Sequence, residues 1–150
     1  MPSLTVPVAP QGPLIQVLLG VSAPKRKALT DAGSPVPAII PATALVDTGA
    51  SHTVIDPGLA TQLGLTPTGS APMITPSTGN TPVSCSIFDV SLAIVAGPPS
   101  NIKLLFHNAC MPVSESALAH QGFEVLLGRD VLASAMLVYN GSSNTLMLGF

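Results

Sequence analysis

Proline and glycine recur along the whole chain, and no other feature of the sequence constrains its fold as strongly. The 150 residues include 16 prolines and 13 glycines, spread from one end to the other. Proline breaks helix interiors because it lacks a backbone donor, so long helices are disfavoured and the uninterrupted segments have the length of strands. The sequence therefore predicts an all-β protein.

The apolar segments between these breaks are the predicted strands. Asn140-Gly141 separates the last two and predicts a hairpin, because both residues tolerate positive φ. The predicted strands cover residues 14–21, 38–46, 52–55, 83–95, 102–108, 123–127, 136–139 and 145–150.

Two short helices are also predicted. The first begins at Asp56-Pro57, where an N-capping acid precedes a proline, and ends before Gly64. The second covers residues 129–135. Each follows an apolar strand and a glycine, and this parallel suggests two related halves.

Charged residues are rare, and their scarcity limits the partners of this chain. Apolar residues make up 47% of the sequence and charged residues only 8%, with a formal net charge of −2. A length of 150 residues fits one domain, residues 1–150, and so apolar a chain is expected to cover part of its surface with another chain. Neither nucleic acid nor an anionic membrane is expected as a partner, because both need a basic surface.

The remaining sequence signals concern location and reactive side chains. There is no apolar run of about 18 residues and no secretory signal, so we expect a cytoplasmic protein or a domain released from a longer polyprotein. Lys25-Arg26-Lys27 is expected in a solvated loop. Cys85 and Cys110 are expected to be free and buried.

Motifs for cofactor chemistry are missing from the sequence. His107 and Cys110 are the only closely spaced pair of metal-ligating residues, which is too few for a zinc site. The glycine-rich phosphate-binding motifs and the G-x-S-x-G turn of serine hydrolases do not occur. The sequence therefore predicts neither a metal nor another cofactor.

One carboxylate stands in an unusual context. Asp47-Thr48-Gly49 directly follows the apolar run that ends at Val46, which predicts a buried strand delivering the carboxylate to a place where water is partly excluded. Thr48 supplies a hydroxyl, and Gly49 allows a tight turn and a close approach of its amide. The similarly spaced acid and glycine at residues 31–33 follow no apolar strand and are expected to form a turn.

Several motifs, in order along the chain, resemble a retropepsin, the single-domain aspartic protease of retroviral type and its bacterial relatives. They are LVDTGAS at residues 45–51, TVI at 53–55, VLLGRDVL at 125–132 and TLML at 145–148. The resemblance runs from about residue 14 to the last residue. It implies the retropepsin-like acid protease fold, a closed or partly open β-barrel with a flap hairpin, one or two short helices and a homodimer.

The resemblance also implies roles for the residues around this motif. Asp47 matches the catalytic aspartate, while Thr48, Gly49 and Ala50 match the residues that support the active-site loop. Gly49 would also bind substrate backbone. By their position along the chain, and not by identity with the family, Ser51, His52, Thr78, Gly79 and Asn80 would bind substrate. The flap would cover about residues 73–84, although the sequence of this segment is unlike the retroviral flap. A last set would pack at the site, namely Leu126, Leu127, Gly128 and Arg129.

Aspartate-based hydrolysis of a peptide bond requires two carboxylates that share one proton, one to activate water and one to protonate the carbonyl oxygen. The chain carries one Asp-Thr-Gly, so the second carboxylate is expected from Asp47 of another copy, on the axis of a homodimer. The partners implied are a second copy and a peptide or protein substrate. The terminal strand that ends at Phe150 is expected in the interface.

Some positions depart from the retroviral pattern. Ser51 and His52 stand where two acids often occur, so Arg129 could pair with Asp130, with an acid across the interface, or with nothing. Ala50 stands where pepsin-like enzymes carry a hydroxyl that stabilises the ionised carboxylates, which predicts a mildly acidic rate optimum. His52 either lines a substrate subsite or is an exposed histidine at a strand end.

Two alternatives to a protease remain at this stage. The first is a retropepsin fold used for binding or dimerisation without proteolysis. The second is an all-β structural or capsid-like domain in which Asp47 caps a turn. The complete Asp-Thr-Gly motif favours the aspartic endopeptidase over both, because a binding module has no need of a costly buried acid.

Overall fold

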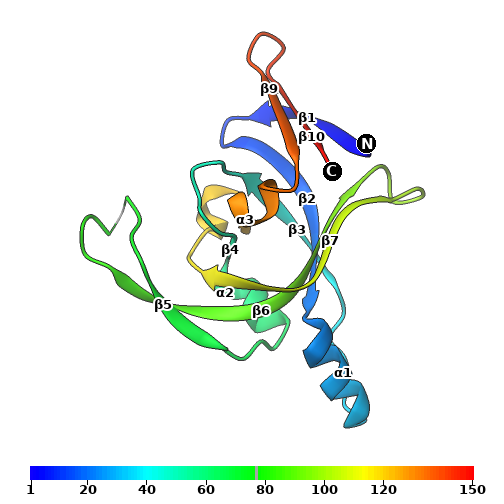
Figure 1. Cartoon of the computed structure of the whole chain (residues 1–150), viewed down its shortest axis with the longest axis vertical. Coiled ribbons are helices and arrows are strands. Elements are labelled where there is room, and N and C mark those ends of the chain that lie inside the picture. Colours follow the sequence, from blue (N-terminus) through cyan, green and yellow to red (C-terminus); the bar gives the residue numbers. More distant parts are fainter. Residues whose placement is uncertain (77) are drawn as a thin grey trace.

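Strands dominate the computed structural model, which describes residues 1–76 and 78–150 (Figure 1). The strands of the described residues are β1 (Ser3–Ala9), β2 (Gly12–Val21), β3 (Ile40–Val46), β4 (Val54–Ile55), β5 (Gly69–Met73), β6 (Val83–Ala96), β7 (Lys103–Glu115), β8 (Val125–Leu127), β9 (Met136–Asn140) and β10 (Thr145–Gly149). The helices are α1 (Ala23–Asp31), α2 (Pro57–Gln62), α3 (Arg129–Leu132) and the 3-10 turn η1 (Ala119–Gln121).

Six of these strands close into a barrel. Neighbours pair in the order β6-β7-β4-β8-β3-β2, and β2 pairs back onto β6 with Val17 opposite Ile94 and Val21 opposite Val90. The sheet continues from β2 through β1 and β10 to β9, and β5 extends it beyond β6. Side chains that alternate along β2 and β6, such as Leu19 and Leu92, are fully buried and fill the barrel. The predicted mostly β barrel is confirmed.

Seven of the eight predicted strands agree with the structure to within two residues at each end. Three regions of strand were not predicted: β1, β5 and the second half of β7. Each of them contains a proline, at Pro7, Pro72 and Pro112. Pro7 lies where β1 pairs with β10 alone, and β5 is the edge strand of the sheet. A proline without N–H is tolerated where one side of a strand has no partner, so these prolines do not end the strands.

The basic cluster lies on a helix, which corrects the prediction of a loop there. Ser22 is the N-cap of α1, and its side chain accepts a hydrogen bond from the amide of Lys25. Proline in the first turn also favours the helix start. No residue of α1 is buried, and Figure 1 shows the helix projecting from the barrel. The helix was missed because it has no apolar face to give a periodic signal.

The predicted helix after Asp56 is confirmed as α2, with Gly64 at φ +60 just beyond its end. The second predicted helix is present but shorter, since α3 ends at Leu132. The hairpin β9–β10 is also confirmed, but for a different reason from the one predicted. Positive φ occurs at Asn144, and the Asn140 side chain accepts hydrogen bonds from the amides of residues 142 and 143 instead.

The two cysteines lie on neighbouring strands of the barrel as free thiols. Cys85 on β6 is half-buried, whereas Cys110 on β7 is exposed. The prediction that both thiols are buried is therefore wrong for Cys110. An apolar sequence neighbourhood did not bury the Cys110 side chain, because successive residues of a strand face opposite sides of the sheet and the buried neighbour is Met111.

Candidate active site

The loop that follows β3 holds the Asp47 carboxylate in a fixed orientation. The Asp47 amide donates to the Leu127 carbonyl over 3.0 Å, and the Ala50 amide donates back to the Asp47 carbonyl over 3.3 Å. The carboxylate oxygen Oδ1 accepts the Gly49 amide at 2.8 Å. A Cβ on residue 49 would lie 3.0 Å from this oxygen, so glycine permits the close turn. The loop thus presents a half-buried carboxylate at the end of a buried strand.

A second segment, at the end of β8, packs against this loop. β8 pairs with β3 in parallel, with Leu127 opposite Val46. A Cβ on Gly128 would lie 2.4 Å from the backbone carbon of His52, so no other residue fits there without a shift of the main chain. The Arg129 amide donates to the Ala50 carbonyl over 2.9 Å. Leu127, Gly128 and Arg129 are therefore brought together with the Asp47 loop.

The Arg129 side chain binds a backbone carbonyl of its own chain and not the predicted acidic partner within that chain. Its Nη1 donates to the backbone carbonyl of Thr48 at 2.8 Å. Asp130 is engaged elsewhere and does not pair with Arg129, because its carboxylate accepts the Thr53 amide and hydroxyl. Arg129 therefore holds the Asp47 loop at two carbonyls, those of Thr48 and Ala50.

Thr53 and Asp130 form a partly buried link, in which Asp130 binds Thr53 and not Arg129. Thr53 is completely buried, and its hydroxyl donates to Asp130 Oδ1 at 2.7 Å. The same hydroxyl accepts the Gly128 amide at 3.2 Å, and Asp130 Oδ2 accepts the Thr53 amide at 2.9 Å. Both residues lie inside the motifs that carry the resemblance, but a short polar side chain within an apolar run was the only signal of their function.

A cleft of about 410 Å³ opens beside Asp47. Its lining includes Gly49, Ala50, Ser51 and His52, together with residues 73–76 from the end of β5 and the segment just after it. Leu126 and Val54 complete the apolar lining. Among the described residues that line this cleft, Asp47 is the one carboxylate. Thr48, Gly49, Ser51 and His52 are exposed in the single chain.

The hairpin tip does not reach this cleft. Thr78, Gly79 and Asn80 lie between β5 and β6 and are not among the residues that line it. The Thr78 hydroxyl instead accepts the Thr75 amide at 2.8 Å within the turn, and Gly79 has φ +60. Ser77, part of the predicted flap, lies outside the described residues.

A second pocket, of about 630 Å³, adjoins the cleft and shares residues with it. Val54, Met73 and Leu126 belong to both, as do residues 75 and 76. The remaining wall is the segment of residues 116–121, which contributes Leu118 and His120. The two pockets are therefore neighbours, and the Asp47 carboxylate lines the smaller one.

Asp56 lies behind that wall and joins it to helix α2. Its Oδ1 accepts the Gly58 amide at 2.9 Å, while Oδ2 accepts the amides of Leu118 at 2.8 Å and Ala119 at 2.9 Å. Burial raises the pKa of this carboxyl, but the three amides and the nearby His120 outweigh that effect and hold the pKa below its ordinary value.

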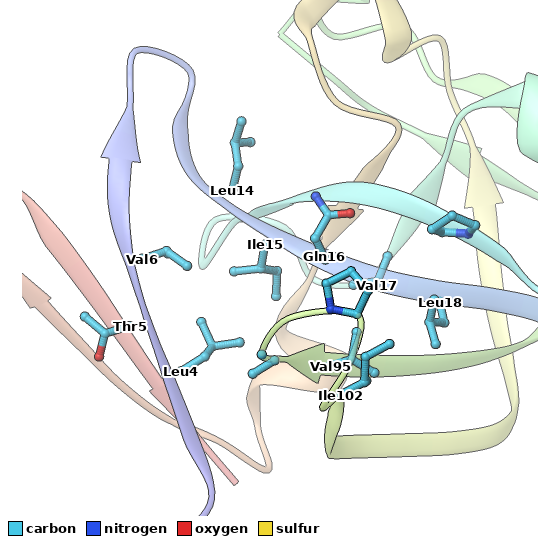
Figure 2. Close-up of a pocket in the computed structure, with 14 residues that line it drawn as sticks. Leu4, Thr5, Val6, Leu14, Ile15, Gln16, Val17, Leu18, Val95 and Ile102 are labelled. Atoms are coloured by element: carbon cyan, nitrogen blue, oxygen red, sulfur yellow. The ribbon is translucent and has the colours of Figure 1, made fainter.

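Another cavity, of about 640 Å³, lies away from Asp47 (Figure 2). Figure 2 shows Leu4 and Val6 of β1, Ile15 and Val17 of β2, and Ile102 around it. Its described lining residues include no carboxylate, histidine or cysteine. Of these two spaces, only the Asp47 cleft is lined by described residues that could act as an acid or a base.

Two further properties bear on cofactors and membranes. In the described part of the chain, no group of three or more His, Cys, Asp or Glu residues is placed to hold a metal ion. None of the described helices is both long and apolar enough to cross a membrane.

Two comparisons with known proteins found similarities to this chain. Residues 36–131 match a family model described as aspartyl protease. The structure is similar to the crystal structure of a retropepsin-like aspartic protease from Rickettsia conorii, with a TM-score of 0.55 and 14% sequence identity over 98% of this chain and 90% of that chain. At this identity the similarity shows a shared fold. No curated protein matches the sequence.

Proposed function

Because this chain belongs to the aspartyl protease family, we propose that it is an aspartic endopeptidase that works as a homodimer, with one Asp47 from each subunit. The observation that carries the proposal is the Asp47 loop, in which the Gly49 amide, the Leu127 carbonyl and Arg129 fix a single carboxylate at the mouth of a cleft. A fixed carboxylate facing a cleft suits acid–base chemistry on a bound substrate.

The reaction needs a partner for Asp47. Two carboxylates about 3 Å apart do not both ionise readily, so the pair shares one proton. The ionised member removes a proton from a water molecule, which attacks the peptide carbonyl carbon, and the protonated member donates its proton to the carbonyl oxygen. The carboxylate that took the proton from water then donates it to the leaving amine as the C–N bond breaks, and a hydroxyl of the tetrahedral intermediate returns a proton to the other carboxylate. Since the described lining of the cleft offers one carboxylate, a second copy supplies the other.

Exposure at the Asp47 loop supports a dimer. Thr48 and Gly49 are exposed in the single chain although they flank the reacting carboxylate, and Thr48 would contact the matching loop of the partner. A second apolar surface lies on β9, where Met136, Val138 and Tyr139 are 53%, 45% and 56% exposed. β9 is the edge strand at the opposite end of the sheet from β5, whereas β10, which was expected in the interface, has strands on both sides. Exposed apolar strand edges favour pairing with another chain.

The hairpin β5–β6 acts as the flap in this proposal. Residues 73–76 of its inner part line the Asp47 cleft, and Figure 1 shows the hairpin extending beyond the barrel. Ile74 is 64% exposed, which leaves an apolar side chain available to a bound peptide. A peptide between the hairpin and the Asp47 loop would lie against mostly apolar walls, so apolar side chains beside the scissile bond are expected.

A peptide library tests the proposal directly. The wild type and Asp47→Asn are incubated with the library from mildly acidic to neutral pH, and the products are identified by mass spectrometry. We expect cleavage by the wild type and none by Asp47→Asn, because the amide cannot take up or release the shared proton. Cleavage by both, or by neither, would refute a protease and favour a binding or dimerisation module.

Sedimentation of the purified protein tests the dimer separately. We expect a concentration-dependent equilibrium between monomer and dimer. Monomers alone at high concentration would refute the shared pair of aspartates. The Asp47→Asn variant serves as a control here, since the loss of one charge per chain should not prevent assembly.

A further inference from the structure

The pocket next to the cleft has one wall with an unusual anchor. Residues 116–121 form this wall, between β7 and β8. Its ends are tied to the barrel through main-chain hydrogen bonds, from the Ser116 amide to the Ile55 carbonyl and from the Glu124 amide to the Thr43 carbonyl. Between these two ties, the middle of the wall is bound to the Asp56 carboxylate through the amides of Leu118 and Ala119.

Packing alone fixes only part of this wall. Leu118 is 5% exposed and forms a small apolar cluster with Val54 and Phe123. Its neighbours in sequence, Ala119 and His120, are exposed. Their positions therefore depend on the main chain, which the Asp56 carboxylate holds at two successive amides.

We propose that Asp56 is a positioning residue that sets the side-chain specificity of the peptidase, because it holds the wall of a pocket for a bulky apolar substrate residue. The pocket adjoins the Asp47 cleft, with which it shares Val54, Met73 and Leu126 as lining residues, and about 630 Å³ is ample for a Leu or Phe side chain. This inference rests on the proposed function, since a peptide must lie in the cleft to place a side chain in the pocket.

Asp56 does not touch the substrate in this arrangement. Its three acceptor contacts are all to backbone amides, of Gly58, Leu118 and Ala119. Loss of the carboxylate would leave two adjacent amides of the wall without their acceptor, and the wall would move to find water or another partner. The pocket would then lose its fit to a large apolar side chain, while the Asp47 loop would keep its own contacts.

Asp56 has a second role, as the N-cap of α2, and the experiment must separate the two. Asp56→Ser keeps an oxygen able to cap the helix, but this oxygen cannot also reach the amides of Leu118 and Ala119. Asp56→Asn is the second variant, because it keeps the size and offers one carbonyl oxygen in place of two carboxylate oxygens. Ser22→Ala is the matched control, since it removes the N-cap of α1, far from the pocket.

The probes are octapeptides in which one peptide bond is reduced to CH2–NH and the preceding residue is Leu, Phe or Ala. Their Kd values are measured by calorimetry. We expect the wild type and Ser22→Ala to bind the Leu and Phe peptides at least about 10-fold more tightly than the Ala peptide. In Asp56→Ser and Asp56→Asn the preference should fall to about 2-fold or less, with the Ala peptide almost unchanged. Hydrogen exchange at residues 118 and 119 should accelerate in both variants.

The outcomes separate this inference from the proposed function. If unreduced peptides are cleaved but the Asp56 variants keep the wild-type preference, the inference is wrong and the protease stands. If the preference depends on Asp56 but no peptide is cleaved, the protease is wrong and the pocket stands. If the wild type binds none of the peptides, or binds all three equally, the pocket does not select bulky side chains and the inference is wrong.

Discussion

The buried hydroxyl of Thr53 should be worth far more to stability than an ordinary threonine hydroxyl. It donates to the Asp130 carboxylate at 2.7 Å and accepts the Gly128 amide at 3.2 Å, in a completely buried position. Thr53→Val preserves the shape of the side chain and removes both hydrogen bonds. A bond to a charged group is worth about 1.5–3 kcal/mol, and a buried donor left without an acceptor costs about 1–3 kcal/mol.

The two effects together predict a loss of about 2.5–6 kcal/mol in the free energy of unfolding, which for a chain of this length lowers Tm by about 5–24 °C. Thermal unfolding by circular dichroism measures the change, at one fixed protein concentration because a dimer unfolds in a concentration-dependent way. Thr61→Val is the matched control, since its exposed hydroxyl donates to a helix carbonyl, and it should change stability by less than about 0.5 kcal/mol.

A double-mutant cycle with Asp130→Asn assigns the effect to the link itself. We expect the two substitutions to be non-additive by about 1–2 kcal/mol, because each breaks the same contact. The reasoning would be refuted by a Thr53→Val protein whose Tm lies within about 1 °C of the wild type, or by strict additivity in the cycle.

Four further predictions follow from the site. Gly128→Ala should yield little folded protein or a much lower Tm, because its Cβ would lie 2.4 Å from the backbone of His52; a normal yield and melting curve would contradict this. Asp56→Ala should lose about 0.5–2 kcal/mol in urea unfolding at pH 7. The folded-state pKa of Asp56 is held below its ordinary value, so this stabilisation is present above about pH 4 and is lost as the pH falls further. The free energies of unfolding of the variant and the wild type should therefore converge toward pH 3. A difference between them that does not change with pH would count against this role of Asp56. The rate of peptide hydrolysis should be maximal at mildly acidic pH and move to lower pH in Ala50→Thr, and a wild-type maximum below about pH 3 would exclude this explanation. His52→Ala should alter the pH dependence of KM, because His52 lines the cleft, and an unchanged profile would make it only an exposed histidine at the end of a strand.

The sequence was informative where chemistry and pattern coincide. The Asp47 loop was predictable because a carboxylate after an apolar run has few ways to be satisfied, and the strand, the turn and Gly49 all point to the same solution. The packing of Gly128 against this loop followed from the resemblance. In contrast, the partner of Arg129 was not predictable. The partner is the backbone carbonyl of Thr48, and every residue has such a carbonyl, so the sequence does not distinguish one from another.

The errors in the fold have a common physical source. Proline was taken to end strands, but Pro7 and Pro72 lie where one side of a strand has no partner, and pairing partners are decided by the tertiary structure. Helix α1 was missed for a related reason, since it is specified by the Ser22 cap and has no apolar face. A proline or an N-cap residue alone predicts secondary structure weakly, because the tertiary structure decides which backbone groups are paired.

Strand β6 has a mechanical consequence for the hairpin over the cleft. From Val90 to Ile94 the strand is held between β2 and β7 with its alternate side chains fully buried, whereas its first residues, from Val83 to Ser86, pair with β5 alone. The second half of β6 is therefore fixed by strands on both sides, whereas its first residues are paired on one side only. We expect any bending of the hairpin to occur between Ser86 and Val90, because pairing with β7 begins at Ile87 and pairing with β2 begins at Val90.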